Sequence, residues 1–133
     1  MPHVLVVDDD WAVSATIKLI LERDGYTVTV ATDGHLALDQ LATTDHDLVI
    51  LDIFMPMMDG FELIGAIRRH RRDLPILVIS GTGSRHGTSA PDFLAMATKL
   101  GASRSLGKPF SARDLLNAVN ACLAVRTGVR ESA

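Results

Sequence analysis

Polar side chains that could take part in chemistry follow four apolar runs of the sequence, at the point where each run ends. They are Asp8, Asp9 and Asp10 after "HVLVV", Asp52 after "LVIL", Ser80 after "ILVI" and Lys108 after "SRSLG". Several carboxylates in one place repel one another and raise their own pKa values, so a cation is expected among them. Carboxylate oxygens, a carbonyl and waters form a hard-oxygen site that suits Mg²⁺, which often bridges to a phosphate. The residue types therefore indicate a magnesium site with phosphate chemistry.

The lysine and the hydroxyl would complete a cradle for a phosphoryl group. Lys108 supplies a compact positive charge, and Ser80 supplies a hydrogen-bond donor. Asp52 is central in this group and is therefore the natural nucleophile. Zinc is not expected, because no paired ligand spacing is found among the histidines, which are His3, His35, His46, His70 and His86.

The elements that must position these residues can be predicted from the apolar pattern. Short continuous apolar runs alternate with longer stretches whose apolar residues recur at helical spacing, which indicates repeated βα units. The predicted strands are residues 3–7, 27–31, 48–51, 76–79 and 103–107. Helices between and after them are marked by Val13, Ile17 and Leu21, by Ala37 and Leu41, by Leu63 and Ile67, by Ala97 and Leu100, and by Leu115, Val119 and Cys122.

The composition of the strands indicates how they pair. Continuous Val, Ile and Leu runs are typical of parallel strands covered on both faces, and right-handed crossovers place helices on those faces. We therefore predict an α/β fold with a doubly wound sheet of five parallel strands. Ligands of such sheets bind at the carboxyl ends of the strands. The polar residues named above should converge at that edge, although they are distant in sequence.

Length and charge restrict the class of protein. With 133 residues, 47% hydrophobic and 22% charged, the chain suits one ordinary globular domain. Its net charge of -3 gives no overall positive field toward nucleic acid or an anionic membrane. The single cysteine, Cys122, excludes an intrachain disulfide and fits a reducing, cytoplasmic setting. The first residues do not resemble a signal peptide, and no run approaches the ~20 apolar residues that span a bilayer.

Four segments carry a resemblance to a known family. "VLVVDDD", "LDIFMPMMDG", "VISGTG" and "GASRSLGKPF" together resemble the receiver domain of bacterial two-component response regulators. The resemblance implies a flavodoxin-like (βα)5 fold with strand order 2-1-3-4-5. It places a receiver domain at residues 1–124, and residues 125–133 are expected to be a flexible tail. The implied partners are a histidine kinase or histidine phosphotransfer protein and an unknown downstream protein, without direct binding to nucleic acid or membrane.

The resemblance also implies roles for individual residues. Asp52 would accept a phosphoryl group from a phosphohistidine donor. Asp9 and Asp52 would bind Mg²⁺ directly, Phe54 would add its backbone carbonyl, and Asp8 would act through water. Ser80 and Lys108 match the positions of the family's hydroxyl and lysine, and the family pattern implies a cis Lys108-Pro109 bond.

Several polar residues have simpler interpretations as helix caps or solvated charges. Asp10 and Asp59 are favoured as capping or turn residues. The run of residues 68–72, "RRHRR", invites a nucleic-acid interpretation, but cations at a helix C-terminus complement the helix dipole and stay solvated, which is the favoured interpretation. Trp11 could shield the site or pack on the surface, and both interpretations stay open.

Parts of the sequence are also compatible with two other functions. A haloacid-dehalogenase-type phosphohydrolase would use the Asp-x-Asp of "VVDDDWA" with Asp8 as nucleophile, but no acidic pair follows Lys108 to complete that metal site. A receiver that acts as a phosphorylation-independent binding module is disfavoured by the intact acids.

Ser105 occupies the position where receivers usually carry Tyr or Phe, so an aromatic side chain cannot act as the switch. We therefore expect the segment 81–90, which is rich in glycine, to be the mobile element that becomes ordered on phosphorylation.

Overall fold

The chain forms five βα units in sequence. The computed structural model describes residues 2–53, 59–80 and 90–132, with the backbone alone for residues 90–94 and 125–132. The strands are β1 (His3–Val7), β2 (Thr27–Ala31), β3 (Leu48–Asp52), β4 (Ile76–Ser80) and β5 (Arg104–Gly107). The helices are α1 (Trp11–Arg23), α2 (Gly34–Thr43), α3 (Gly60–His70), α4 (Ala90–Leu100) and α5 (Ala112–Ser132).

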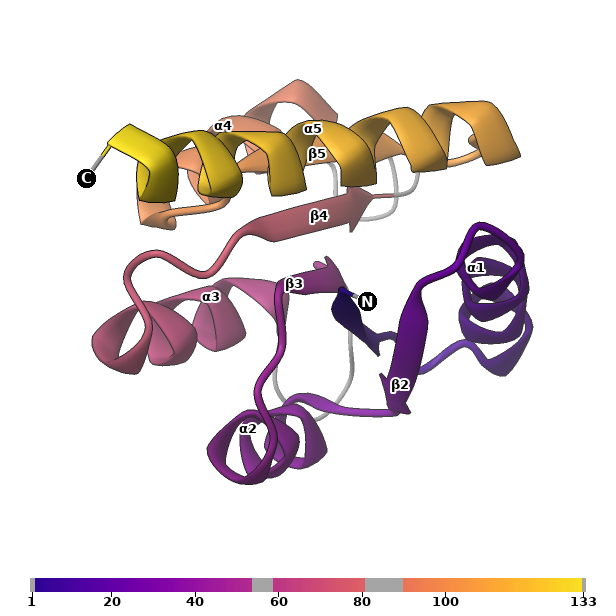
Figure 1. The fold of residues 1–133 in the computed structure, drawn as a ribbon. Coiled ribbons are helices and arrows are strands. Elements are labelled where there is room, and N and C mark those ends of the chain that lie inside the picture. Colours follow the sequence, from indigo (N-terminus) through magenta and orange to yellow (C-terminus); the bar gives the residue numbers. More distant parts are fainter. Residues whose placement is uncertain (1, 54–58, 81–89, 133) are drawn as a thin grey trace.

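The strands form one parallel sheet in the order β2-β1-β3-β4-β5, which confirms the predicted topology (Figure 1). Residues alternate between its faces. Leu5, Val49 and Val78 belong to the apolar cluster that also includes residues of α2, α3 and α4. Val4, Ile50 and Leu77 belong to the cluster that includes residues of α1 and α5. Both faces are therefore buried, which explains the continuous apolar runs of the central strands β1, β3 and β4.

Aspartate side chains cap the N-termini of three of the helices. The side chain of Asp10 accepts hydrogen bonds from the backbone N–H groups of Ala12 and Val13 at the start of α1. Asp33 caps α2, and Asp59 caps α3 by accepting from the N–H of Glu62. Each carboxylate satisfies backbone donors that the first helical turn leaves without a partner. The capping roles predicted for Asp10 and Asp59 are confirmed.

The arginine run at the end of α3 has two different roles. Arg69, His70 and Arg72 are exposed, as expected for solvated cations. For Arg68 that interpretation was wrong: its Nε and Nη2 donate to the carbonyl oxygen of Gly101 at 3.0 and 2.7 Å. Its Nη1 donates to the carbonyl oxygens of Arg71 and Leu74 at 2.9 and 2.6 Å. Arg68 thus joins the end of α3 to the connection between α4 and β5.

The last helix continues beyond the boundary expected at residue 124. α5 is helical to Ser132, so residues 125–132 have a regular backbone, while the flexibility of this tail stays a prediction. Cys122 is buried on the inner face of α5, and burial raises its thiol pKa to about 11. This agrees with a structural thiol. No helix within the described ranges is long and apolar enough to cross a membrane.

A buried histidine lies two residues before β3, at the amino edge of the sheet. His46 is 1% exposed, its Nδ1 lies 3.0 Å from the carbonyl oxygen of Thr44, and its ring centroid lies 4.1 Å from that of His3. Burial lowers the pKa of His46, and the charges of His3 and Arg71 lower it further, against the opposing effects of the Thr44 hydrogen bond and Asp47. The folded state therefore disfavours protonation of this ring.

We expect His46 to make the domain less stable as the pH falls below about 6.5, the ordinary histidine value, because the unfolded chain then binds a proton that the folded chain resists. The free energy of unfolding should fall by at most about 1.4 kcal/mol per pH unit for this one proton. Urea titrations between pH 7.5 and 5 should show a smaller loss in His46→Gln than in the wild type. His35→Gln, which changes an exposed histidine of α2, is the control and should keep the wild-type slope. Equal slopes in all three proteins would contradict the prediction.

Candidate functional site

Three carboxylates converge at the carboxyl edge of the sheet. β1 and β3 are neighbours, with Val7 opposite Leu51, so the residues that follow this pair lie side by side. One oxygen from each of Asp8, Asp9 and Asp52 can be chosen so that all three atoms lie within 4.8 Å of one another. Asp8 is 2% exposed and Asp52 7%, whereas Asp9 is exposed. The predicted convergence of the acids is therefore present.

Lys108 reaches the two buried carboxylates from the other side. Its Nζ donates to Oδ2 of Asp52 at 3.0 Å and lies 3.6 Å from Oδ2 of Asp8. Burial lowers the pKa of Lys108, but the hydrogen bond to Asp52 and the charges of Asp52 and Asp8 outweigh it, so the net shift is upward. The lysine is therefore held in its charged form against the acids.

The main chain of β4 and β5 fixes where the lysine begins. The N–H of Lys108 donates to the carbonyl oxygen of Ser80 at 2.7 Å, and the Lys108-Pro109 peptide bond is cis, as the resemblance implied. Ser80 is 1% exposed at the end of β4, one residue beyond the pair between Asp52 and Ile79. The hydroxyl, lysine and acids thus come from neighbouring strand ends.

Other residues named from the sequence have different outcomes. Phe54 lies outside the described residues, as does the predicted switch segment 81–90 except for the backbone of its last residue, so the carbonyl ligand and the switch remain predictions. Ser105 is exposed on the edge strand β5. Trp11 has 79% of its surface exposed at the start of α1, which agrees with a surface position rather than a shield over the acids.

The carboxylate of Asp8 lies in an environment that disfavours its negative charge. Its Oδ1 accepts a hydrogen bond from the N–H of Asp10 at 2.9 Å, but its buried Oδ2 has no hydrogen-bond partner within the described part of the chain. Burial is the main cause that raises its pKa to about 6, the charges of Asp52 and Asp9 add to it, and the Asp10 N–H and Lys108 oppose it. A buried oxygen of this kind, in a set of carboxylates, fits a hard divalent cation such as Mg²⁺.

Replacing Asp8 with asparagine should stabilise the domain in the absence of divalent cations. Asparagine keeps the size of the side chain and an acceptor for the Asp10 N–H. It removes a carboxyl group whose pKa in the folded state lies above the ordinary value of 3.8. Above pH 6 that charge costs the folded state on the order of 2 kcal/mol, which the variant should regain. Urea denaturation at pH 7.5 in EDTA measures the gain.

The same variant should respond less to Mg²⁺. The wild type should gain stability when Mg²⁺ is added, because a ligand that binds only the folded state stabilises it, and Asp8→Asn should gain less. Asp10→Asn is the matched control, since asparagine is also a good N-cap residue and Asp10 is not in the acidic cluster. A less stable Asp8→Asn protein in EDTA would show that the buried charge is already compensated.

Two residues that support this site were not assigned that role from the sequence. Ser14 Oγ donates to the carbonyl oxygen of Asp8 at 3.2 Å. Gly60 donates its N–H to the carbonyl oxygen of Ile53 at 2.7 Å, and a Cβ atom at Gly60 would lie 2.5 Å from the Cα of Ile53. The Asp59-Gly60 dipeptide was interpreted as a turn, and it is the only sequence signal for this close approach between α3 and the end of β3.

Comparisons with known proteins agree with this geometry. The family model for the response regulator receiver domain matches residues 4–120. Response regulator MprA of Mycolicibacterium vanbaalenii is 39% identical over 134 residues, which cover 98% of this chain and 55% of that protein. Response regulator SaeR of Staphylococcus aureus is 32% identical over 120 residues, which cover 90% of this chain and 50% of that protein. The chain therefore spans about half the length of these relatives.

The fold is also similar to solved structures. Chemotaxis protein CheY4 of Vibrio cholerae matches with a TM-score of 0.84 and 32% identity, over 92% of this chain and 99% of that one. Receiver domains are signalling domains rather than conventional enzymes, and they bind Mg²⁺ at an acidic pocket. Because the family match covers most of the chain and a relative at 39% identity covers nearly all of it, this chain belongs to the receiver domains of two-component response regulators.

Proposed function

We propose that this receiver domain accepts a phosphoryl group on Asp52 from a phosphohistidine in an Mg²⁺-dependent transfer. The observation that carries the proposal is the position of Asp52. Its carboxylate ends a central strand, accepts from Lys108 Nζ at 3.0 Å and has an oxygen within 4.8 Å of oxygens of Asp8 and Asp9. This arrangement supports the assignment of a nucleophile, a positive charge and a set of cation ligands to one point of the sheet edge.

The chemistry assigned to Asp52 is an in-line displacement. A carboxylate oxygen attacks phosphorus, the new P–O bond forms as the P–N bond to the donor histidine breaks, and the imidazole leaves with that electron pair. Lys108 is placed to stabilise the negative charge on the transferring phosphoryl oxygens. The Ser80 hydroxyl is assigned a hydrogen bond to one of these oxygens.

We assign the binding of the cation to the acidic residues at this edge of the sheet. Asp9 and Asp52 would hold Mg²⁺ with the backbone carbonyl of Phe54, and Asp8 would act through water. When bound, the ion neutralises charge on the transferring group. The buried Oδ2 of Asp8 and the raised pKa of that carboxyl support a cation here, because a second positive charge would relieve the repulsion that Lys108 only partly offsets.

The partners follow from this chemistry. The donor would be a histidine kinase or a histidine phosphotransfer protein of the cytoplasm, and phosphorylation would change the affinity for an unknown downstream protein. Exposed Ser105 offers no ring that could turn inward, so the switch is assigned to segment 81–90 instead. We propose no direct contact with nucleic acid or membrane for this domain.

Mapping of the phosphoryl group tests the proposal. The chain is treated with acetyl phosphate and Mg²⁺, the acyl phosphate is trapped chemically, and the modified peptide is located by mass spectrometry. Modification at Asp52 supports the receiver mechanism. Modification at Asp8, or continued release of phosphate from an added phosphomonoester, would instead support the hydrolase mechanism.

A further inference from the structure

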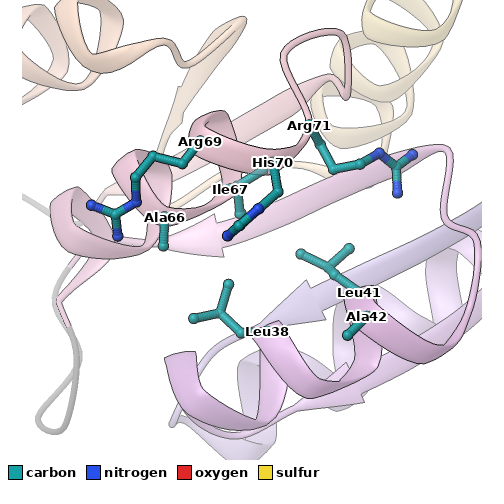
Figure 2. Close-up of a pocket in the computed structure, with 8 residues that line it drawn as sticks. All are labelled: Leu38, Leu41, Ala42, Ala66, Ile67, Arg69, His70 and Arg71. Atoms are coloured by element: carbon teal, nitrogen blue, oxygen red, sulfur yellow. The ribbon is translucent and has the colours of Figure 1, made fainter.

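A second concave site lies between the later halves of α2 and α3. The cavity has a volume of about 330 Å³, at the small end of the range of ligand sites in proteins. Leu38, Leu41 and Ala42 of α2 line it from one side, and Ala66 and Ile67 of α3 line it from the other (Figure 2). The wall formed by these five residues is entirely apolar.

The remaining lining residues all carry or can carry positive charge. They are Arg69 and His70 at the end of α3 and Arg71, the residue that follows. Figure 2 shows the guanidinium groups of Arg69 and Arg71 on opposite sides of His70, whose ring is directed into the space between the helices. Among the residues that the structure describes, no aspartate or glutamate lines the cavity. The charge around the apolar wall is therefore of one sign.

Hydrogen bonds to the carbonyl groups at the end of α3 come from Arg68 rather than from these cations. Arg68 already donates to the carbonyl oxygens of Arg71 and Leu74. The side chains of Arg69, His70 and Arg71 form no hydrogen bond or ion pair with another residue that the structure describes. Their hydrogen-bond donors are thus available to an anion at the cavity.

The cavity is separate from the phosphoacceptor site. α3 begins at Gly60, which contacts Ile53 just after β3, and runs antiparallel to the strand so that His70 lies at the amino edge of the sheet. None of the lining residues belongs to the acidic cluster or contacts Lys108. A ligand here would leave Asp52 accessible.

We propose that this cavity binds a small carboxylic acid with an apolar body, such as a medium-chain fatty acid. The hydrocarbon would displace water from Leu38, Leu41 and Ile67, and the carboxylate would accept charge-assisted hydrogen bonds from Arg69 or Arg71. A fully polar anion would leave the apolar wall without a partner. An apolar cation would face the guanidinium groups of Arg69 and Arg71, which carry charge of its own sign.

Octanoate is a suitable probe, and chemical shifts of the ¹⁵N-labelled chain report where it binds. Amide shifts should move in residues 38–42 and 66–71 and should saturate. The double variant Arg69→Gln/Arg71→Gln should bind at least about tenfold more weakly, because it loses the charged donors. Arg72→Gln is the matched control, since Arg72 is exposed, next in sequence and not part of the cavity. Equal affinity of the double variant and the control would overturn the proposal.

Further probes separate the charge from the apolar body. Octylamine and octanol should bind more weakly than octanoate, and acetate should not produce the saturating shifts. Ala42→Phe, which fills the cavity from an exposed helical position, should abolish octanoate binding, whereas Asp52→Asn should not change it. Equal binding of octylamine and octanoate would overturn the assigned charge, and shifts scattered over the surface would overturn the site.

Discussion

Replacing Asp52 with asparagine should reduce stable phosphoryl incorporation from acetyl phosphate to background. The amide is a poor nucleophile and cannot form the acyl phosphate, although it keeps the size of the side chain and an acceptor for the Lys108 Nζ that lies 3.0 Å from the carboxylate. The loss should be complete rather than partial, since in the proposed step the only bond formed is made by this residue. Trapping of the acyl phosphate followed by mass spectrometry of the intact chain measures it.

Controls for Asp52→Asn separate chemistry from folding. Asp10→Asn removes a charge two residues from Asp8 but keeps the helix cap, so it should be phosphorylated at close to the wild-type rate. Circular dichroism should show Asp52→Asn as fully folded, because one of three crowded carboxylates is neutralised without a change of shape. Undiminished incorporation in Asp52→Asn would show that another carboxylate accepts the phosphoryl group.

The substitution Gly60→Ala should lower the free energy of unfolding by about 3 kcal/mol or more. The added Cβ would lie 2.5 Å from the Cα of Ile53 and 2.9 Å from the carbonyl oxygen of Asp52, and both contacts are with backbone that cannot rotate away. Either α3 must shift or the end of β3 must move. The second response would displace Asp52, so slower phosphorylation should accompany the lost stability. Urea denaturation and the trapping assay measure the two effects.

Gly65→Ala in the same helix is the matched control. A Cβ at Gly65 meets nothing within 4 Å, so alanine should add about 1 kcal/mol of stability through its higher helix propensity. Opposite signs for the two substitutions are expected. If both variants gained stability, the backbone at the contact between α3 and the end of β3 would be able to move apart without loss of stability, which would contradict the prediction.

Much of the scaffold was determined by local sequence. A strand that is buried on both faces is expected to be apolar along its length, so the runs 48–51 and 76–79 could be recognised as strands without knowledge of their neighbours. The polar residue that ends each such run is conspicuous for the same reason. Because parallel strands all present their carboxyl ends at one edge, the convergence of Asp8, Asp52 and Lys108 followed from the pattern, while the strand order came from the family resemblance.

What only the tertiary structure decided depends on residues that are distant in sequence. Arg68 resembles its neighbours in the basic run, but its guanidinium donates to Gly101, 33 residues away, because α3 packs beside the α4 to β5 connection. His46 is buried against His3, and Asp8 has a raised pKa chiefly because the folded chain removes it from water. Desolvation and hydrogen bonding act over a few ångströms in space, and sequence spacing does not report such distances once the chain has turned back on itself. For this reason the residues of the acidic site were predictable by type, whereas their electrostatics and the cavity between α2 and α3 were set by packing.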